Sequence, residues 1–134
     1  MKEEQKIRVL IAEDEAHIRL LLRKIMEQMG AVVVAEATNG QEAVDLFQQH
    51  RPHIVLMDVV MPVLDGKEAI RRIMAMERCA FVIVLSALSS MDVVKECLAL
   101  GAANFIRKDN PVDQIKRYIK ESWQEFQKMG CPYA

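Results

Sequence analysis

The sequence predicts an α/β domain of the doubly wound kind, a (βα)5 unit in which helices cover both faces of a parallel five-stranded sheet. Short blocks of β-branched and other apolar residues alternate five times with longer stretches in which apolar residues recur every three or four positions. The central blocks lack alternating polar residues, which is typical of strands covered on both faces. The helical stretches are long enough for crossover connections, which favour parallel pairing.

The predicted strands are compact apolar blocks. The first contains Val9, Leu10 and Ile11 and is soon followed by an acidic triplet, Glu-Asp-Glu at 13–15. The second is a run of valines. The third and fourth are each followed at once by a polar residue, Asp58 and Ser86 respectively. We expect the strands at residues 7–12, 32–35, 53–57, 81–85 and 103–107.

Each strand is followed by a stretch with helical periodicity. The first helix carries an apolar face from Ile18 to Met29 and stops at Gly30, a residue that commonly ends helices. The second helix opens at Asn39-Gly40. Apolar residues at helical spacing mark the faces of the second to fifth helices: Ala43, Val44 and Phe47; Ile70, Ile73 and Met74; Val93, Val94, Cys97 and Leu98; and Ile115, Ile119, Trp123 and Phe126.

Length and charge limit the class of protein. The 134 residues fit one domain, expected at residues 5–128, with a short tail at 129–134 and no output domain. A net charge of −1 offers no positive field for a polyanion, so we expect no direct nucleic-acid binding. No apolar run approaches the roughly 20 residues that cross a bilayer, and the acidic, polar start is unlike a signal peptide. We therefore expect a cytoplasmic protein that does not associate with membranes.

Neither the cysteines nor the histidines form a metal-binding motif. Cys79, Cys97 and Cys131 are an odd set without a CxxC pair, which suits a reducing compartment better than a disulfide framework. We expect them to be core or surface packing residues. The three histidines show no ligand spacing, so we expect no structural zinc site.

Acidic residues follow two of the predicted strands. Glu13 and Asp14 follow the first strand and Asp58 the third, and ligands of open parallel sheets bind beyond the carboxyl ends of strands. Holding these carboxylates together is costly unless a cation lies between them. Because the candidate ligands are all oxygens, we expect Mg²⁺ or a similar hard ion.

The same edge of the sheet carries the groups that phosphoryl transfer requires. An ionised Asp58 can act as a nucleophile and form an acyl phosphate. Lys108, after the fifth strand, offers a positive charge for the phosphoryl oxygens, and Ser86 offers a hydroxyl donor. Their joint occurrence at strand ends favours a functional site over a set of solvated surface charges.

These motifs, taken together, closely resemble the bacterial response-regulator receiver domain of two-component phosphorelays, typified by the single-domain chemotaxis regulator. The resemblance rests on Ile-Ala-Glu-Asp-Glu at 11–15, Met-Asp-Val-Val-Met-Pro-Val-Leu-Asp-Gly at 57–66, Ser86-Ala87, and Gly-Ala through lysine at 101–108. It extends from about residue 7 to residue 123. The resemblance implies a flavodoxin-like fold with strand order 2-1-3-4-5.

The resemblance also implies roles for the acidic residues. Asp58 matches the aspartate that takes a phosphoryl group from a phosphohistidine on a sensor histidine kinase or a phosphotransfer protein. Asp14 matches the direct Mg²⁺ ligand, Glu13 the acid that acts through a metal-bound water, and the backbone carbonyl of Val60 the third protein ligand. The protein would thus be a signalling receiver that catalyses its own phosphotransfer and autodephosphorylation, rather than an enzyme acting on other substrates.

The switch residues follow by the same resemblance. Lys108 matches the family's lysine, Ser86 the hydroxyl that moves to the phosphoryl group, and Phe105 the aromatic rotamer switch. Phosphorylation is then expected to reshape the fourth helix, fifth strand and fifth helix, which would bind a downstream protein. Specificity for the kinase is expected on the first helix, at residues 17–24.

Two features depart from the family pattern. A proline commonly follows the lysine, often through a cis bond, but here Asp109 follows Lys108, where a cis bond would cost about 2.5–4 kcal/mol. The geometry of that loop stays open, and Asp109 places a negative charge beside Lys108. Val60 and Leu88, which flank the acceptor by this mapping, are apolar where the family often has polar residues. We therefore expect slow loss of phosphate from Asp58.

Three other functions compete with this interpretation. A phosphorylation-independent adapter would not need the acidic residues or Lys108. A phosphohydrolase of the haloacid-dehalogenase type needs a second acid two residues after its nucleophile, where this chain has Val60. A flavin-binding module needs a phosphate loop after the first strand, where the acidic triplet would repel a phosphate.

Overall fold

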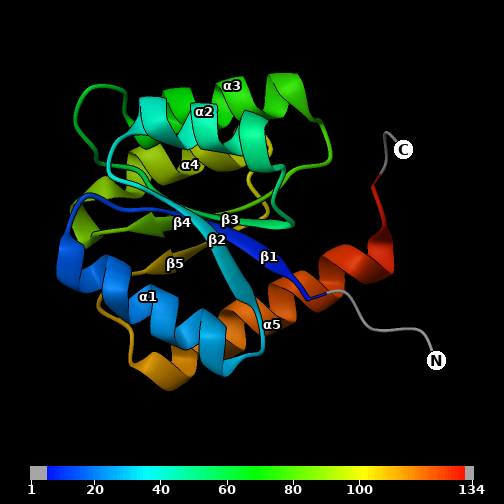
Figure 1. Cartoon of the computed structure of the whole chain (residues 1–134). Helices are drawn as coiled ribbons and strands as arrows, with labels where there is room; N and C mark the ends of the chain where they lie inside the picture. Colours follow the sequence, from blue (N-terminus) through cyan, green and yellow to red (C-terminus); the bar gives the residue numbers. More distant parts are fainter. Residues whose placement is uncertain (1–5, 132–134) are drawn as a thin grey trace.

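The structure is a computed structural model that describes residues 6–131. Five parallel strands form one sheet in the order β2-β1-β3-β4-β5 (Figure 1). The strands are β1 (Arg8–Ala12), β2 (Val32–Ala37), β3 (Ile54–Asp58), β4 (Phe81–Ser86) and β5 (Asn104–Arg107). The helices are α1 (Ala16–Gln28), α2 (Gly40–His50), α3 (Gly66–Met76), α4 (Met91–Ala99) and α5 (Val112–Met129), with a short 3-10 turn, η1 (Leu88–Ser90), before α4. The predicted fold class and strand order are confirmed.

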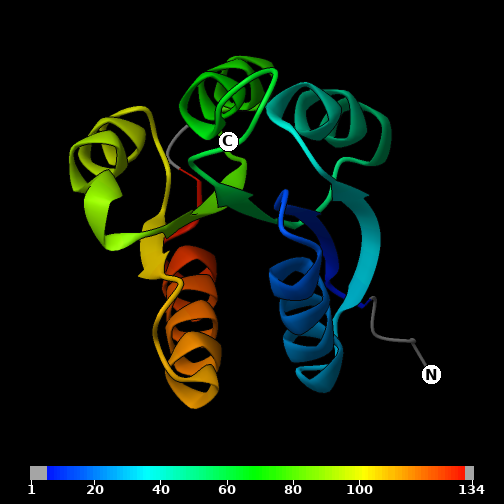
Figure 2. The same ribbon diagram turned by 90° about the vertical axis from the view of Figure 1, so that its left-hand side faces the viewer.

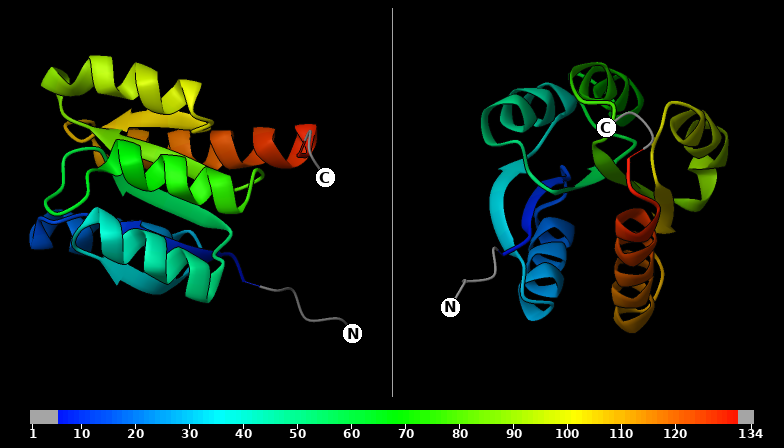
Figure 3. Two further views of the ribbon diagram at one scale, coloured as in Figure 1. Left: turned by 90° about the horizontal axis from the view of Figure 1, so that it is seen from above. Right: turned by 90° about the vertical axis from the view of Figure 1, so that its right-hand side faces the viewer.

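The helices form two layers around the sheet. Viewed along the strands, α2, α3 and α4 cover one face, and α1 and α5 cover the other (Figures 2 and 3). Neighbouring residues of a strand point to opposite layers, so that Leu10 packs in the core beneath α2 and α3 while Val9 and Ile11 pack in the core beneath α1 and α5. Burial on both faces explains why the strands read as continuous apolar runs.

Local sequence signals start the helices near the carboxyl ends of the strands. The Asn39 side chain accepts a hydrogen bond from the Glu42 N–H at 2.8 Å, and the Glu42 carboxylate accepts one from the Thr38 N–H at 2.7 Å. Asp65 caps α3 in the same way through the Glu68 N–H, at 2.9 Å. Such side-chain caps satisfy backbone donors that the first helical turn leaves open. They hold the loops that border the predicted site.

The boundaries differ slightly from the expected ones. The expected domain start, residue 5, and tail residues 132–134 lie outside the described residues. Helix α5 continues to Met129, one residue past the expected domain end. The Lys108–Asp109 bond is trans, as are all peptide bonds of the described residues. Within this part of the chain, no helix is both long and apolar enough to span a membrane.

The expectation that all three cysteines are packing residues is wrong for two of them. Cys97 is buried in α4 and free, but Cys79 and Cys131 form a disulfide with a Cα–Cα distance of 5.5 Å. The chain returns from the end of α5 to the turn before β4, which brings together two cysteines separated by 52 positions. The disulfide encloses the aromatic cluster of Phe81, Trp123 and Phe126 within its loop.

Opening this disulfide is expected to destabilise the oxidised protein. Closing a loop of this length restricts the unfolded chain, so Cys131→Ser should lower the free energy of unfolding by about 2–4 kcal/mol in denaturant titrations. A reductant should cause the same loss in the natural chain and none in the variant. An unfolding curve of the natural chain that does not respond to reductant would contradict the prediction.

Candidate functional site

The site lies at the carboxyl edge of the sheet, where β1 and β3 end side by side. Ala12 pairs with Met57 in the parallel register, so the next residues, Glu13 and Asp58, emerge next to each other. Carboxylate oxygens of Glu13, Asp14 and Asp58 lie within 4.8 Å of one another. Glu13 is 0% and Asp58 2% exposed, whereas Asp14 is exposed to solvent. Two of the three acids are therefore removed from water.

Lys108 is the cation at the centre of this cluster. Its Nζ lies 2.9 Å from Asp58 Oδ2, 3.0 Å from Glu13 Oε1 and 3.5 Å from Glu15 Oε1. The loop that carries it is held to β4, because the Lys108 N–H donates to the Ser86 carbonyl at 2.8 Å. Asp109 does not compete for the ammonium group, since its carboxylate pairs with the Arg107 guanidinium at 2.8 Å.

Burial dominates the electrostatics of the acids. Burial raises the pKa of Glu13 to about 7 from an ordinary value of 4.5. The negative charge of Asp58 also raises this pKa, whereas a hydrogen bond from the Glu15 N–H and the contact with Lys108 lower it. Burial also raises the pKa of Asp58, against the effect of the Lys108 ammonium. The pKa of Lys108 is raised in turn, because its contacts with Asp58 and Glu13 outweigh its own burial.

The loop after β3 is shaped by two close backbone contacts. At Gly66 a Cβ would lie 2.1 Å from the Asp58 carbonyl oxygen, and at Gly40 a Cβ would lie 2.0 Å from the Leu64 carbonyl oxygen. Only glycine fits at either position. Between them Val63, 83% exposed, has a φ of 67°, a left-handed conformation that β-branched residues rarely adopt. Packing against Asp58 and α2 thus determines the path of this loop.

The donor set fits a hard cation. The oxygens come from carboxylates, and the Val60 backbone lies beside them, since its N–H donates to Asp58 Oδ1 at 3.2 Å. Glu13 Oε2 accepts a hydrogen bond from the Glu15 N–H, and Glu13 Oε1 lies 3.0 Å from Lys108 Nζ. Three carboxylates around a single ammonium group leave a net negative charge in this partly buried cluster, which favours a metal ion as a further partner. The acidic pocket is compatible with metal binding.

The predicted switch residues lie on the neighbouring strands. Ser86 is fully buried at the end of β4, and its Oγ lacks a hydrogen-bond partner within residues 6–131. Phe105 is half-buried on β5, where it pairs with Val84 rather than with the end of β4, and it packs against the core under α4. The side chain of Leu88 lies outside the part of the chain that the structure describes.

Two contacts at the site are not indicated by the sequence motifs. Glu15 reaches Lys108, and the Arg19 guanidinium donates to the Glu13 carbonyl at 2.9 Å. A charged residue on a helix ordinarily signals a solvated face, so nothing in the helical periodicity distinguishes Arg19 from its charged neighbours.

Comparison with known proteins identifies the class. Residues 9–120 match the response regulator receiver domain family, and the chain belongs to that family. It is 43% identical to the chemotaxis protein CheY of Thermotoga maritima over 101 residues, which are 75% of this chain and 84% of that protein. It is 35% identical to the CheY of Bacillus subtilis over 115 residues, 86% of this chain and 96% of that one.

Solved structures agree with this assignment. The Borrelia burgdorferi CheX–CheY complex with BeF3 and Mg²⁺ contains a chain that is 32% identical, with a TM-score of 0.81 and coverage of 86% of this chain and 87% of that one. The response regulator domain of Thermotoga maritima CheB is 31% identical, with a TM-score of 0.80 and coverage of 90% of this chain and 96% of that one. The chain is thus a phosphorylation-dependent signalling switch of two-component systems, as its motifs predict.

The raised pKa of Glu13 predicts how pH affects the metal-free protein. The pKa of Glu13 is about 7 in the folded state against an ordinary value of 4.5, so the folded state holds the proton more tightly. Protonation of Glu13 therefore stabilises the fold fully below pH 4.5, and this stabilisation is lost as the pH rises through 7. The free energy of unfolding should fall by up to about 3 kcal/mol over this window. Glu13→Gln should remove most of this slope. Denaturant titrations at several pH values would refute the prediction if both proteins gave flat profiles.

Proposed function

We propose that Asp58 accepts a phosphoryl group from a phosphohistidine of a sensor histidine kinase or phosphotransfer protein, with Mg²⁺ held by Glu13, Asp14, Asp58 and the Val60 carbonyl. The observation that carries the proposal is a buried carboxylate, Asp58, next to two further acids and within 2.9 Å of a lysine ammonium. When bound, Mg²⁺ would supply positive charge for the phosphoryl oxygens. Asp58 then has both the nucleophilic oxygen and the neutralising surroundings that transfer needs.

The transfer itself exchanges one bond for another. An Asp58 carboxylate oxygen attacks the phosphorus atom, a P–O bond forms as the P–N bond to the imidazole breaks, and the leaving nitrogen keeps the electron pair. Lys108 stabilises the charge on the phosphoryl oxygens after it exchanges its contact with Asp58 for one with them. The Ser86 hydroxyl donates to the same group. The chain would thus contribute groups to its own phosphotransfer, and in autodephosphorylation a water would attack the phosphorus, break its bond to the Asp58 oxygen and release inorganic phosphate.

The output would be a change in protein binding at α4, β5 and α5. β5 is the edge strand of the sheet, and Phe105, Arg107 and Tyr118 help to line a hollow on this side. Movement of Ser86 toward a phosphoryl group would vacate space for the half-buried Phe105 and alter that surface.

We further propose that the kinase or phosphotransfer protein docks on α1, where Leu20 is 51% exposed. We also propose that the chain works in the cytoplasm, where ATP is the source of phosphoryl groups.

Phosphorylation by a small donor tests the proposal directly. Incubation with acetyl phosphate and Mg²⁺ should add one acid-stable, base-labile phosphate, detected by intact-mass spectrometry, and Asp58→Asn should abolish it. Asp109→Asn, which removes a carboxylate that is 67% exposed and paired with Arg107, is the matched control and should keep labelling. No uptake by the natural chain would favour the adapter, and fast turnover of the donor without accumulation of the phosphorylated protein would favour a phosphohydrolase.

The apolar surroundings predict a long-lived phosphate. Val60 lies beside Asp58, and its side chain is 63% exposed. Because this side chain is apolar, it offers no polar group to orient an attacking water. Val60→Asn should raise the rate of autodephosphorylation severalfold, measured by loss of the labile phosphate after the donor is removed. If Val60→Asn and Leu88→Asn both leave the rate unchanged, the slow hydrolysis has another origin.

A further inference from the structure

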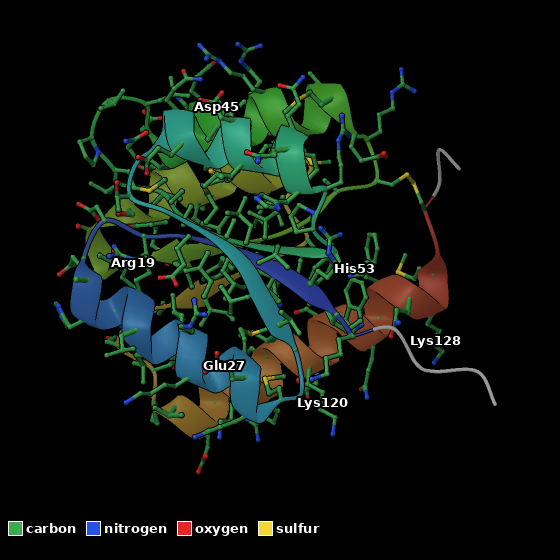
Figure 4. All side chains as sticks on the ribbon, viewed as in Figure 1. Arg19, Glu27, Asp45, His53, Lys120 and Lys128 are labelled. Carbon is green, nitrogen blue, oxygen red and sulfur yellow. A yellow bond between two sulfur atoms is a disulfide. The ribbon has the colours of Figure 1, made fainter. Side chains whose placement is uncertain are left out.

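Arg19 links α1 to the backbone of the acidic pocket. Its Nη1 donates to the Glu13 carbonyl at 2.9 Å, and its Nε donates to Glu36 Oε1 at 3.2 Å. The side chain is only 20% exposed. In Figure 4, Arg19 lies between α1 and the strands at the end of the molecule where β1 finishes, whereas Glu27 lies toward the other end of α1.

This contact completes the anchoring of Glu13 from both sides. The Glu13 N–H donates to the Ala37 carbonyl of β2 at 3.0 Å, and the Glu13 carbonyl accepts from Arg19. Glu13 is therefore held through the peptide group on each side of it, the preceding one by β2 and the following one by the Arg19 guanidinium. The Arg19 N–H also donates to the Glu15 carbonyl at 2.9 Å, so a single residue contacts the acidic segment through its backbone and its side chain.

We infer that Arg19 is a positioning residue that holds the Glu13-Asp14 segment in its metal-binding geometry. The inference rests on the proposed role of this pocket as a Mg²⁺ site. Partners of metal ligands that do not touch the ion commonly change metal affinity by 10–100-fold, because they set the direction in which the ligands point. Arg19 would act on the metal ligands in this way through its hydrogen bond to the Glu13 main-chain carbonyl.

The direction of the effect separates positioning from simple charge. Arg19 carries a positive charge near a site for a divalent cation, so removing it would strengthen Mg²⁺ binding if only Coulomb repulsion mattered. Loss of positioning acts in the opposite direction and weakens binding. The sign of the change in affinity therefore distinguishes the two explanations.

Arg23 provides a matched control on the same helix. It pairs with Glu36, as Arg19 does, and with Glu27 at 3.4 Å, and its side chain is 37% exposed. These contacts omit the Glu13 carbonyl. Arg23→Ala therefore removes a positive charge and a Glu36 partner from α1 without touching the acidic segment.

The experiment compares Arg19→Ala, Arg19→Lys and Arg23→Ala in the full chain. Amide chemical shifts followed during Mg²⁺ titration should show about tenfold weaker binding for Arg19→Ala and less than a twofold change for Arg23→Ala. Arg19→Lys keeps the charge but has one nitrogen, which cannot bridge the Glu13 carbonyl and Glu36 in the same geometry, so it should fall between them. Phosphorylation of the Arg19 variants should recover at saturating Mg²⁺.

A second readout needs no metal. Amide hydrogen exchange of residues 13–16 in the metal-free protein should quicken in Arg19→Ala and stay unchanged in Arg23→Ala, while thermal unfolding of the two variants stays similar. Equal exchange and equal Mg²⁺ affinity in the two variants, or tighter binding by Arg19→Ala, would overturn the inference. If the natural chain binds no Mg²⁺, the proposed function fails, and the exchange data alone then decide whether Arg19 positions this segment.

Discussion

Two carboxylates buried side by side are the central constraint of this protein. Glu13 and Asp58 emerge from adjacent strands with almost no solvent exposure, and each negative charge there disfavours the other. Lys108 compensates part of this cost from across the site, at 3.0 and 2.9 Å. The raised pKa values of both acids show that one ammonium group does not compensate it fully. A site in this state gains from any further positive charge, which is the physical basis of the proposed cation binding.

The topology creates this constraint and determines which residues share it. Strand order β2-β1-β3-β4-β5 makes β1 and β3 neighbours although α1, β2 and α2 separate them in the chain. A shift of one residue in their register would place Glu13 and Asp58 on opposite faces of the sheet, because side chains alternate between the faces. β5 lies two strands from β3, with β4 between them, and the long Lys108 side chain covers that distance. Acidic side chains at the ends of the neighbouring strands β1 and β3 and a long lysine side chain after β5 therefore match the geometry of the sheet.

The elements and the acidic pocket follow from the sequence because their signals are local or repeated. Apolar blocks mark the strands, and parallel strands bring their carboxyl ends to one edge whatever their order. The strand order, like the switch roles of Ser86 and Phe105, follows from the family resemblance and not from periodicity. The Cys79–Cys131 disulfide was missed because an odd number of cysteines carries no information about which ends of the chain meet. The Arg19 contact was missed because its acceptor is a main-chain carbonyl, which has no side-chain signature.

The buried hydroxyl of Ser86 is the group through which the proposed switch would act. Its Oγ has no hydrogen-bond partner among the described residues, so it is free to donate to a new acceptor. Asp58 pairs with Leu85, so Ser86 is the next residue along β4 beyond the acceptor. A phosphoryl group on Asp58 would bring new acceptor oxygens to this edge and stabilise whichever Ser86 conformation donates to them. A covalent change can shift a conformational equilibrium only by such a difference in interaction energy between two states. In the proposed switch this preference would reach β5 through the backbone hydrogen bond from the Lys108 N–H to the Ser86 carbonyl, which joins the ends of β4 and β5.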